Sequence, residues 1–148
     1  MTTMLRRAAT LATALALAAP LAAPALAAPA APATGTAKPL VTKLRAPNLG
    51  ATVLARGDRQ ALYYWNREKD GKIRCVGACA RAWPPYIVAK GRAVPRKIAG
   101  FSGTFGVVVR PDGRRQLTYN RLPLYIYAHE GKGIVLCDDV DGWFAIRL

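Results

Sequence analysis

The sequence is poor in the residue types that most often carry out catalysis. Among 148 residues it has one histidine, one serine and 8 Asp and Glu residues. The serine, Ser102, does not stand in a Gly-x-Ser-x-Gly motif, so a hydrolytic set would depend on Ser102 and His129 alone. We therefore expect a protein that is not an enzyme and that needs no cofactor.

Cysteine is also scarce, with three in the chain. In an oxidising compartment a set of three leaves one thiol over. Cys75 and Cys79 are the expected disulfide, because the Val-Gly-Ala between them can turn tightly enough. A bridge from Cys75 to Cys137 stays open as an alternative, and an unpaired Cys137 would behave as a small hydrophobic residue.

A different use of these residues is metal binding. The three cysteines and His129 could form a Cys3His set for zinc or copper, since thiolates and imidazole suit those ions. Their spacing is unlike the compact Cys-x-x-Cys pairs of zinc modules. This alternative predicts a periplasmic metal-binding or redox accessory protein that uses Cys137 and His129.

Residues 1–27 follow the plan of a secretory signal peptide. Arg6 and Arg7 form the basic start, and an alanine- and leucine-rich stretch follows that proline interrupts twice, which argues against a membrane span. An Ala-x-Ala site ends at Ala27, and no cysteine follows that could carry a lipid. We expect a periplasmic or secreted protein with no stable membrane anchor after cleavage.

Residues 28–43 are rich in Ala, Pro and Thr and have few large apolar side chains, which predicts a disordered tether. The remaining residues, 44–148, suffice for one small domain. Because so small a domain buries little apolar surface, it would benefit from a disulfide.

The charge is strongly unbalanced. The chain has a net charge of +14, from 22 basic and 8 acidic residues. Loss of Arg6 and Arg7 with the signal would leave +12. Such a charge would attract an anionic partner, and we expect a component of the cell envelope such as phospholipid headgroups or acidic polysaccharide. The sequence carries no known nucleic-acid-binding signature, so we expect no nucleic acid partner.

Two stretches of the sequence resemble each other. Leucine, tyrosine, a second aromatic residue, glutamate, glycine and cysteine recur at the same offsets, starting at Leu62 and at Leu124. Apolar runs broken by a glycine and aspartate turn precede both. The pattern predicts two pseudo-repeats, at about 50–88 and about 103–148, each built as strand, tight turn and strand.

Alternation supports the strands, because successive side chains of a strand point to opposite faces. From Leu62 onward, Tyr63 and Trp65 would face one way, and Leu62 and Tyr64 the other. Asp112-Gly113 predicts a hairpin, residues 143–146 a closing strand, and residues 79–83 a single helical turn. We expect an all-β antiparallel domain whose two units face each other across a shared core, with Tyr64 on the outer surface.

The motif residues also support a family resemblance. The chain resembles bacterial secreted repeats and small predicted lipoproteins that share a Tyr-x-[Phe/Trp/Tyr]-x-x-Asp motif followed by Cys-x-Gly-x-Cys and Ala-Trp-Pro-Pro. The corresponding residues are Tyr63, Trp65, Glu68, Cys75, Cys79, Trp83, Pro84 and Pro85, and in the second half Tyr125, Tyr127 and Glu130. The chain departs from the pattern where both motif aspartates are glutamates, and at Cys137.

The resemblance implies export and a small fold, and it implies no biochemical activity. Glu68 and Glu130 could form a carboxylate pair for acid–base chemistry. One glutamate in each unit is also what a duplication produces without any chemistry. The sequence therefore predicts an exported envelope protein that serves as a non-catalytic binding or accessory module.

Overall fold

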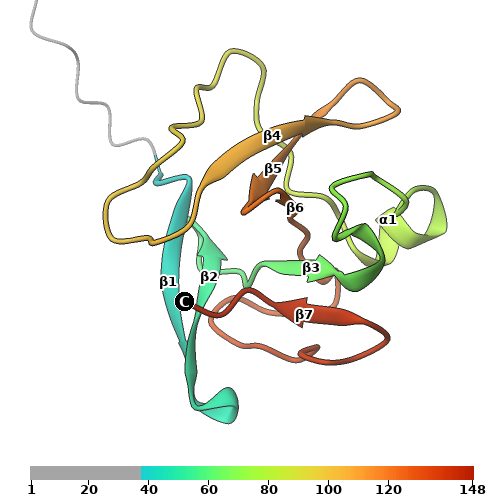
Figure 1. The fold of residues 1–148 in the computed structure, drawn as a ribbon. Coiled ribbons are helices and arrows are strands. Elements are labelled where there is room, and N and C mark those ends of the chain that lie inside the picture. Colours follow the sequence, from blue (N-terminus) through green and yellow to red (C-terminus); the bar gives the residue numbers. More distant parts are fainter. Residues whose placement is uncertain (1–37) are drawn as a thin grey trace, which may run out of the picture. The chain divides into compact units, whose positions relative to one another are not determined.

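The computed structural model describes residues 38–148, and the expected all-β antiparallel fold is confirmed (Figure 1). Short strands dominate, with one brief α-helix and two 3-10 turns. The strands are β1 (Val41–Ala46), β2 (Ala51–Arg56), β3 (Tyr63–Trp65), β4 (Phe105–Val109), β5 (Arg115–Tyr119), β6 (Leu122–Pro123) and β7 (Trp143–Ala145). The helical elements are η1 (Pro47–Leu49), η2 (Asn66–Glu68) and α1 (Ala78–Ala82).

The start of the domain differs from the sequence-based expectation. β1 begins at Val41, and all six of its residues pair with β2, so residues 41–43 belong to the domain and not to a tether. The burial pattern of this strand does not alternate strictly, because Leu44 and Ala46 are buried on one face and Val41 on the other. The pattern also adjoins an Ala/Pro-rich stretch, which obscures it. The expected signal peptide, 1–27, and the tether up to residue 37 lie outside the described residues.

The strands form three antiparallel sheets, β1–β2, β3–β7 and β4–β5–β6. Single bridges join the sheets, the central one between Tyr63 and Tyr125. Each of these tyrosines donates its backbone N–H to the carbonyl of the other, at 2.9 Å in both directions. The first and second segments of similar sequence therefore meet directly at their motif tyrosines.

Side chains of both segments alternate as predicted, but they enter two hydrophobic clusters where one shared core was expected, and Tyr64, expected on the outer surface, packs against the second cluster. Tyr63 and Trp65 pack into one cluster with Trp83 and Trp143, whereas Leu62 and Tyr64 pack into the other. The second segment repeats this division, with Tyr125 and Tyr127 in the first cluster and Leu124 and Ile126 in the second. Both faces of these short strands are thus covered, which explains why Leu62 and Tyr63 are each fully buried.

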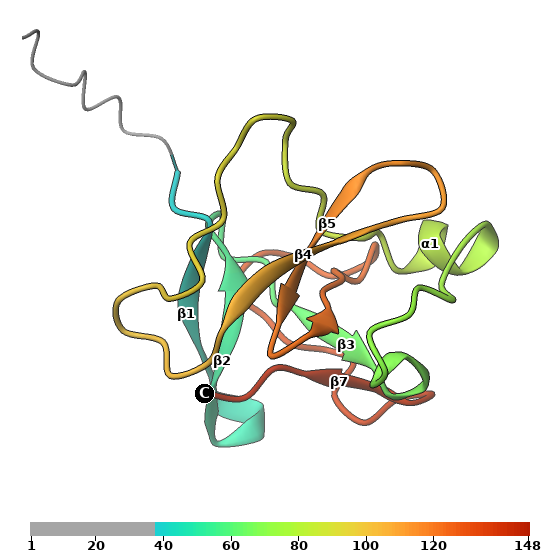
Figure 2. The same ribbon diagram turned by 45° about the horizontal axis from the view of Figure 1, so that its top comes forward.

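Backbone hydrogen bonds join the end of each segment to the other, and Figure 2 shows β7 beside β3. In the first segment, the backbones of Leu54 and Leu62 form a ring of three hydrogen bonds with Ile146, of 2.7 to 3.0 Å. In the second, Leu117 and Leu124 form the same ring with Tyr86, with bonds of 2.9 to 3.0 Å. Tyr86 lies near the end of the first segment and Ile146 near the end of the second. Each segment therefore supplies backbone that completes the hydrogen bonds of the other.

The turns and the helix agree with the sequence. In the β4–β5 hairpin Gly113 has a φ of 77° and donates its N–H to the Arg110 carbonyl at 2.9 Å. α1 spans one residue earlier than expected and stops before Pro84-Pro85, since the residue before proline avoids helical geometry. Within residues 38–148 no helix is long and apolar enough to span a membrane.

Candidate functional site

The motif tyrosines and glutamates form two reciprocal pairs in the interior. The Tyr63 hydroxyl donates to Glu130 Oε1 at 2.5 Å, and the Tyr125 hydroxyl donates to Glu68 Oε2 at 2.7 Å. Each tyrosine thus binds the glutamate of the other segment. Burial, followed by the glutamate partner, raises the pKa of both tyrosines well above the ordinary value, so both hydroxyls keep their protons as donors.

Both glutamates also hold the backbone of their own segment. Glu68 Oε1 accepts the N–H groups of Arg74 at 2.5 Å and Cys75 at 2.7 Å. Glu130 Oε1 accepts the Leu136 N–H at 2.6 Å, and burial raises the pKa of Glu130. With 0% and 6% of their surface exposed, the two carboxylates orient loops and are closed to a substrate.

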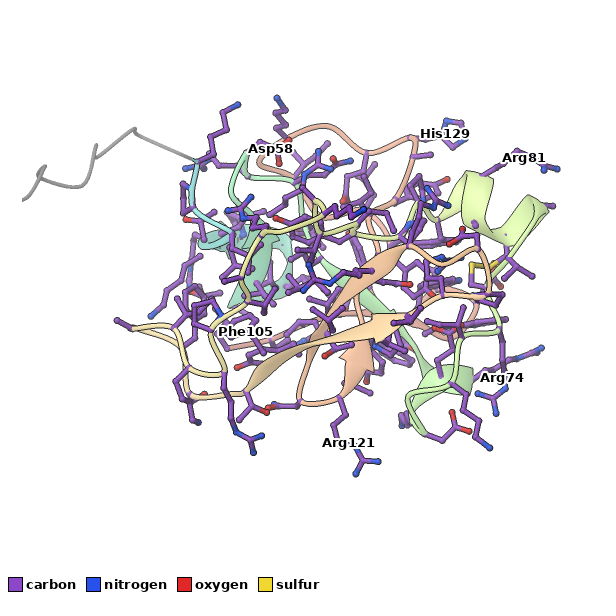
Figure 3. All side chains as sticks on the ribbon, turned by 90° about the horizontal axis from the view of Figure 1, so that it is seen from above. Asp58, Arg74, Arg81, Phe105, Arg121 and His129 are labelled. Atoms are coloured by element: carbon purple, nitrogen blue, oxygen red, sulfur yellow. A yellow bond between two sulfur atoms is a disulfide. The ribbon has the colours of Figure 1, made fainter. Side chains whose placement is uncertain are left out.

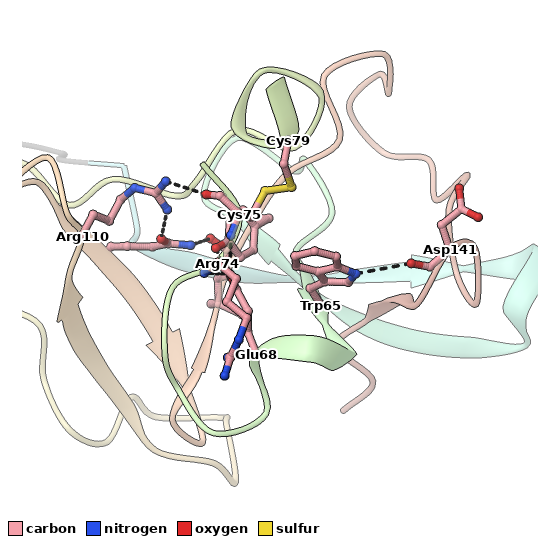
Figure 4. Close-up of a disulfide and its surroundings, with 10 residues drawn as sticks. Trp65, Glu68, Arg74, Cys75, Cys79, Arg110 and Asp141 are labelled. Carbon is pink, nitrogen blue, oxygen red and sulfur yellow. Dashed lines mark hydrogen bonds between the residues drawn. A yellow bond between two sulfur atoms is a disulfide. The ribbon is translucent and has the colours of Figure 1, made fainter. Parts of the chain in front are cut away.

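The expected disulfide between Cys75 and Cys79 is confirmed, and Figure 4 shows it beside α1. Cys137 is a half-buried free thiol whose pKa is raised, first by burial and then by nearby carboxylates. A raised pKa keeps the sulfur in its less reactive thiol form. Because Cys75 is bonded to Cys79, the alternative bridge from Cys75 to Cys137 is not formed.

The Cys3His set of the metal alternative is not assembled. Cys75 and Cys79 are bonded to each other, and His129 lies exposed on the surface (Figure 3). Across residues 38–148 there is no group of three or more His, Cys, Asp or Glu side chains placed to hold a metal ion. His129 instead packs edge-on against Tyr127, with ring centroids 5.5 Å apart.

The remaining motif aromatics form one stack between the segments. Trp83 and Trp143, each a few residues beyond a motif cysteine, lie parallel with centroids 4.0 Å apart. Trp65 stacks on the outer side of Trp143 at 5.4 Å, and Tyr127 lies against Trp83 at 4.8 Å. Such contacts add to the free energy gained by burying the rings. The motif tryptophans thus act in packing.

The two prolines that follow Trp83 guide the chain from the first segment into the second. The Pro84 carbonyl accepts the Ile126 N–H at 3.0 Å, and Pro85 forms a bridge with Tyr125. Proline donates no backbone hydrogen bond, so it suits this edge position. Both motif prolines therefore lie at the contact between segments.

Arg110 is a buried residue that sequence reasoning did not single out. It is 3% exposed, and its guanidinium donates to Gln116 Oε1 at 2.5 Å and to the Cys75 carbonyl at 2.8 Å (Figure 4). Its Nε lies 3.7 Å from an Asp112 carboxylate oxygen. Arg110 thereby links the β4–β5 hairpin to the loop that contains Cys75. An arginine next to a Pro-Asp-Gly turn gives no local signal of burial.

A cationic surface lies along the start of β1 and the loop between α1 and β4. We define it by six exposed basic side chains, two near the start of β1 and four in that loop. They are Lys38, Lys43, Lys90, Arg92, Arg96 and Lys97. Figures 1 and 2 both show this loop running past β1.

Contacts fix this loop against the start of the domain. Arg92 Nη2 donates to the Lys38 carbonyl at 3.0 Å, and Lys43 Nζ lies 5.7 Å from the Phe101 ring centroid. Within residues 38–148, none of the six side chains of the cationic surface forms an ion pair. A sequence signal exists for it, because residues 71–111 contain eight Lys and Arg and no Asp or Glu.

Comparisons with known proteins leave this chain without an assigned relative. No family model, no curated protein and no solved structure matches it. The resemblance to the bacterial secreted repeats and predicted lipoproteins therefore stays a prediction.

Proposed function

We propose that this protein is an exported, non-catalytic module that binds an anionic polymer of the cell envelope through its cationic surface. The observation that carries the proposal is the segregation of charge. Six exposed basic side chains gather there without a carboxylate partner in the described part of the chain. Unpaired exposed cations attract polyanions over about 10 Å at ordinary salt concentrations.

A polymer suits this surface better than a lipid bilayer. Peripheral membrane binding usually combines basic residues with apolar side chains that enter the lipid. The large apolar side chains that are exposed within residues 38–148 are Val76, Val109, Ile134, Leu136, Val140 and Leu148. None of them lies on β1 or in the loop between α1 and β4, which favours a glycan or other chain that carries carboxylate or phosphate groups.

The non-catalytic role is supported by the carboxylates. Glu68 and Glu130, the residues that an acid–base mechanism would use, are buried and engaged in hydrogen bonds to tyrosines and backbone. Export is supported by the signal-like residues 1–27 and by the disulfide, which is compatible with an oxidising compartment.

Charge-neutralising variants test the polymer proposal. We would titrate the protein with polygalacturonate, with neutral dextran as a reference, at about 50 mM and about 500 mM NaCl. Replacement of Lys90, Arg92, Arg96 and Lys97 by glutamine should weaken binding about tenfold or more at low salt. Binding of the unchanged protein should also fall steeply with salt.

A second variant controls for net charge. Replacement of Arg59, Lys69, Lys72 and Arg121 by glutamine removes the same number of Lys and Arg from other exposed positions. We expect this variant to lose less than about threefold in affinity. Equal losses in both variants would show that charge alone, and no particular surface, holds the polymer. Equal binding to dextran would also contradict the proposal.

Intact mass measurement on protein recovered from the producing cell's envelope fraction tests export. We expect a mass that lacks residues 1–27, contains one disulfide, and gains one alkyl group on Cys137 once the protein is unfolded. An uncleaved chain would contradict export. Alkylation of all three cysteines only after chelation would instead support the metal alternative.

A further inference from the structure

A pocket of about 440 Å³ opens beside the β3–β7 pair, and none of the six side chains of the cationic surface lines it. Tyr64 and Phe144 provide its aromatic side. They stand directly opposite each other in the strand register, and their rings stack with centroids 5.6 Å apart and planes 24° from parallel. The volume lies within the range of about 300–1,000 Å³ that is typical of small-molecule sites.

The polar side of the pocket is fixed in place by hydrogen bonds. Asp138 accepts the Ala145 N–H at 2.9 Å through one carboxylate oxygen and Arg147 Nη2 at 2.6 Å through the other. These contacts hold Asp138 and Arg147 against β7 without a ligand. Because the two charges compensate each other, the pair adds no net charge to the pocket.

Other polar groups at the pocket are free to bind. Within residues 38–148, the Tyr64 hydroxyl, the Asp139 carboxylate and the Asn120 side-chain N–H₂ make no hydrogen bond, although all three residues line the pocket. Together they present a hydroxyl, an acceptor and a donor around a stacked aromatic pair.

We propose that this pocket binds one ring of an uncharged sugar. A pyranose ring has a C–H face that packs on aromatic rings and a rim of hydroxyls that need both donors and acceptors. The stacked Tyr64 and Phe144 match the face, and the groups of Asp139 and Asn120 match the rim. The unpaired Asp139 disfavours an anionic ligand, so this site takes a different class of ligand from the cationic surface and does not depend on it.

Titration of ¹⁵N-labelled protein with three uncharged oligosaccharides tests this site. The probes are cellotetraose, maltotetraose and tetra-N-acetylchitotetraose, each in about 500 mM NaCl to suppress the cationic surface. We expect at least one probe to shift the amide signals of Tyr64, Asp139 and Phe144 in a saturable way. No shift at these amides with any probe at about 10 mM would overturn the proposal, since weak single-ring sites bind in the millimolar range.

Variants separate stacking from general damage to the fold. Tyr64→Ala should weaken binding of the active probe about tenfold, and Tyr64→Phe should weaken it less because the ring remains. Val109→Ala, which trims a side chain 66% exposed on β4, is the control and should leave binding unchanged. Unaltered binding by Tyr64→Ala would contradict the proposal.

Asp139→Gly provides a second test should Tyr64→Ala fail to fold. Asp139 is exposed, its side chain has no partner among the described residues, and glycine tolerates its φ of 61°. We expect this change to lower affinity about threefold, by loss of one hydrogen bond. Retained affinity would count against the site. The polygalacturonate titration at low salt is unaffected by either result, so failure of this inference and failure of the polymer proposal can be told apart.

Discussion

At the scale of single residues, the buried carboxylates distinguish this domain most clearly. Glu68 and Glu130 lie in the interior, and each joins a tyrosine of the other segment to loop backbone of its own. A buried acceptor that loses its donor costs more than the average hydrogen bond contributes, because the desolvated oxygen gains no substitute. The two tyrosine hydroxyls should therefore matter for stability.

Removal of either hydroxyl tests this. Tyr63→Phe and Tyr125→Phe should each lower the free energy of unfolding by about 1–3 kcal/mol, as measured by urea denaturation. Tyr64→Phe is the matched control, because its hydroxyl makes no hydrogen bond within residues 38–148, and it should change stability by less than about 0.5 kcal/mol. Similar losses in all three variants would show that the reciprocal pairs have no special role.

Asp58 gives a pH-dependent test. Its carboxylate binds Arg56 at 2.6 Å, and this bond lowers the pKa of Asp58 from 3.8 to about 2. A lowered pKa stabilises the fold above pH 3.8, and the contribution is lost as the pH falls through about 2. Asp58→Asn should thus cost about 1–2 kcal/mol at neutral pH, a difference that disappears near pH 2.

Asp70→Asn is the control for that experiment. Asp70 also binds an arginine, but its side chain and that of its partner Arg74 are each 44% exposed, against 16% for Asp58. Solvent screens such an exposed pair, so a much smaller change is expected. A pH-independent loss in Asp58→Asn would show that packing, and not the ion pair, explains its effect.

At the scale of elements, hairpin turns connect most neighbouring strands, and one of them carries an unfavourable residue. Asn120 and Arg121 join β5 to β6, with φ values of 49° and 69°. Two-residue hairpin turns of this kind favour Asn followed by Gly, because residues other than glycine pay a steric cost at positive φ. The first position fits the turn and the second does not.

Arg121→Gly should therefore stabilise the protein by about 0.5–1 kcal/mol, measured as a rise in the free energy of unfolding and in Tm. The gain is smaller than the steric cost because glycine also increases the entropy of the unfolded chain. Arg115→Gly, within β5, should be destabilising, since glycine weakens a strand interior. Destabilisation by Arg121→Gly would mean that the arginine side chain has a contact of its own.

Much of the local structure, the strand alternation and the hairpin turns, could be predicted from the sequence. The alternation in Leu62 to Trp65 correctly predicted which side chains share a face, although not that both faces are covered, and Asp112-Gly113 located the β4–β5 hairpin. Both signals are local, because strand periodicity and turn chemistry are set by adjacent residues. The predicted start of the domain, at residue 44, was wrong by three residues, because β1 directly follows an Ala/Pro-rich stretch.

At the scale of the whole molecule, an exchange of backbone hydrogen bonds makes the two segments interdependent. The backbone of Tyr86 completes the ring of hydrogen bonds in the second segment, and that of Ile146 completes the ring in the first. The central tryptophan stack contains one residue from each segment. Neither segment can therefore bury its core or satisfy its backbone alone.

Separate segments test this dependence. Residues 38–100 and residues 101–148, each produced alone, should lack dispersed amide signals in NMR spectra and cooperative thermal unfolding. When mixed, the two segments should regain dispersed signals and cooperative unfolding, because each supplies the backbone hydrogen bonds that the other lacks. A dispersed spectrum from either segment alone would show that this segment folds without the other. The intact domain serves as the reference.

The sequence by itself determined the all-β class, the alternation around Tyr63, the Asp112-Gly113 turn and the charge of the domain, and it favoured the pairing of Cys75 with Cys79, because each depends on neighbouring residues or on composition. Only the tertiary structure decided that Arg110 is buried, that the motif glutamates bind tyrosines across the two segments, and that Tyr64 and Phe144 stack beside a pocket. Those contacts join residues far apart in the chain, and their partners are selected by packing that no local pattern encodes.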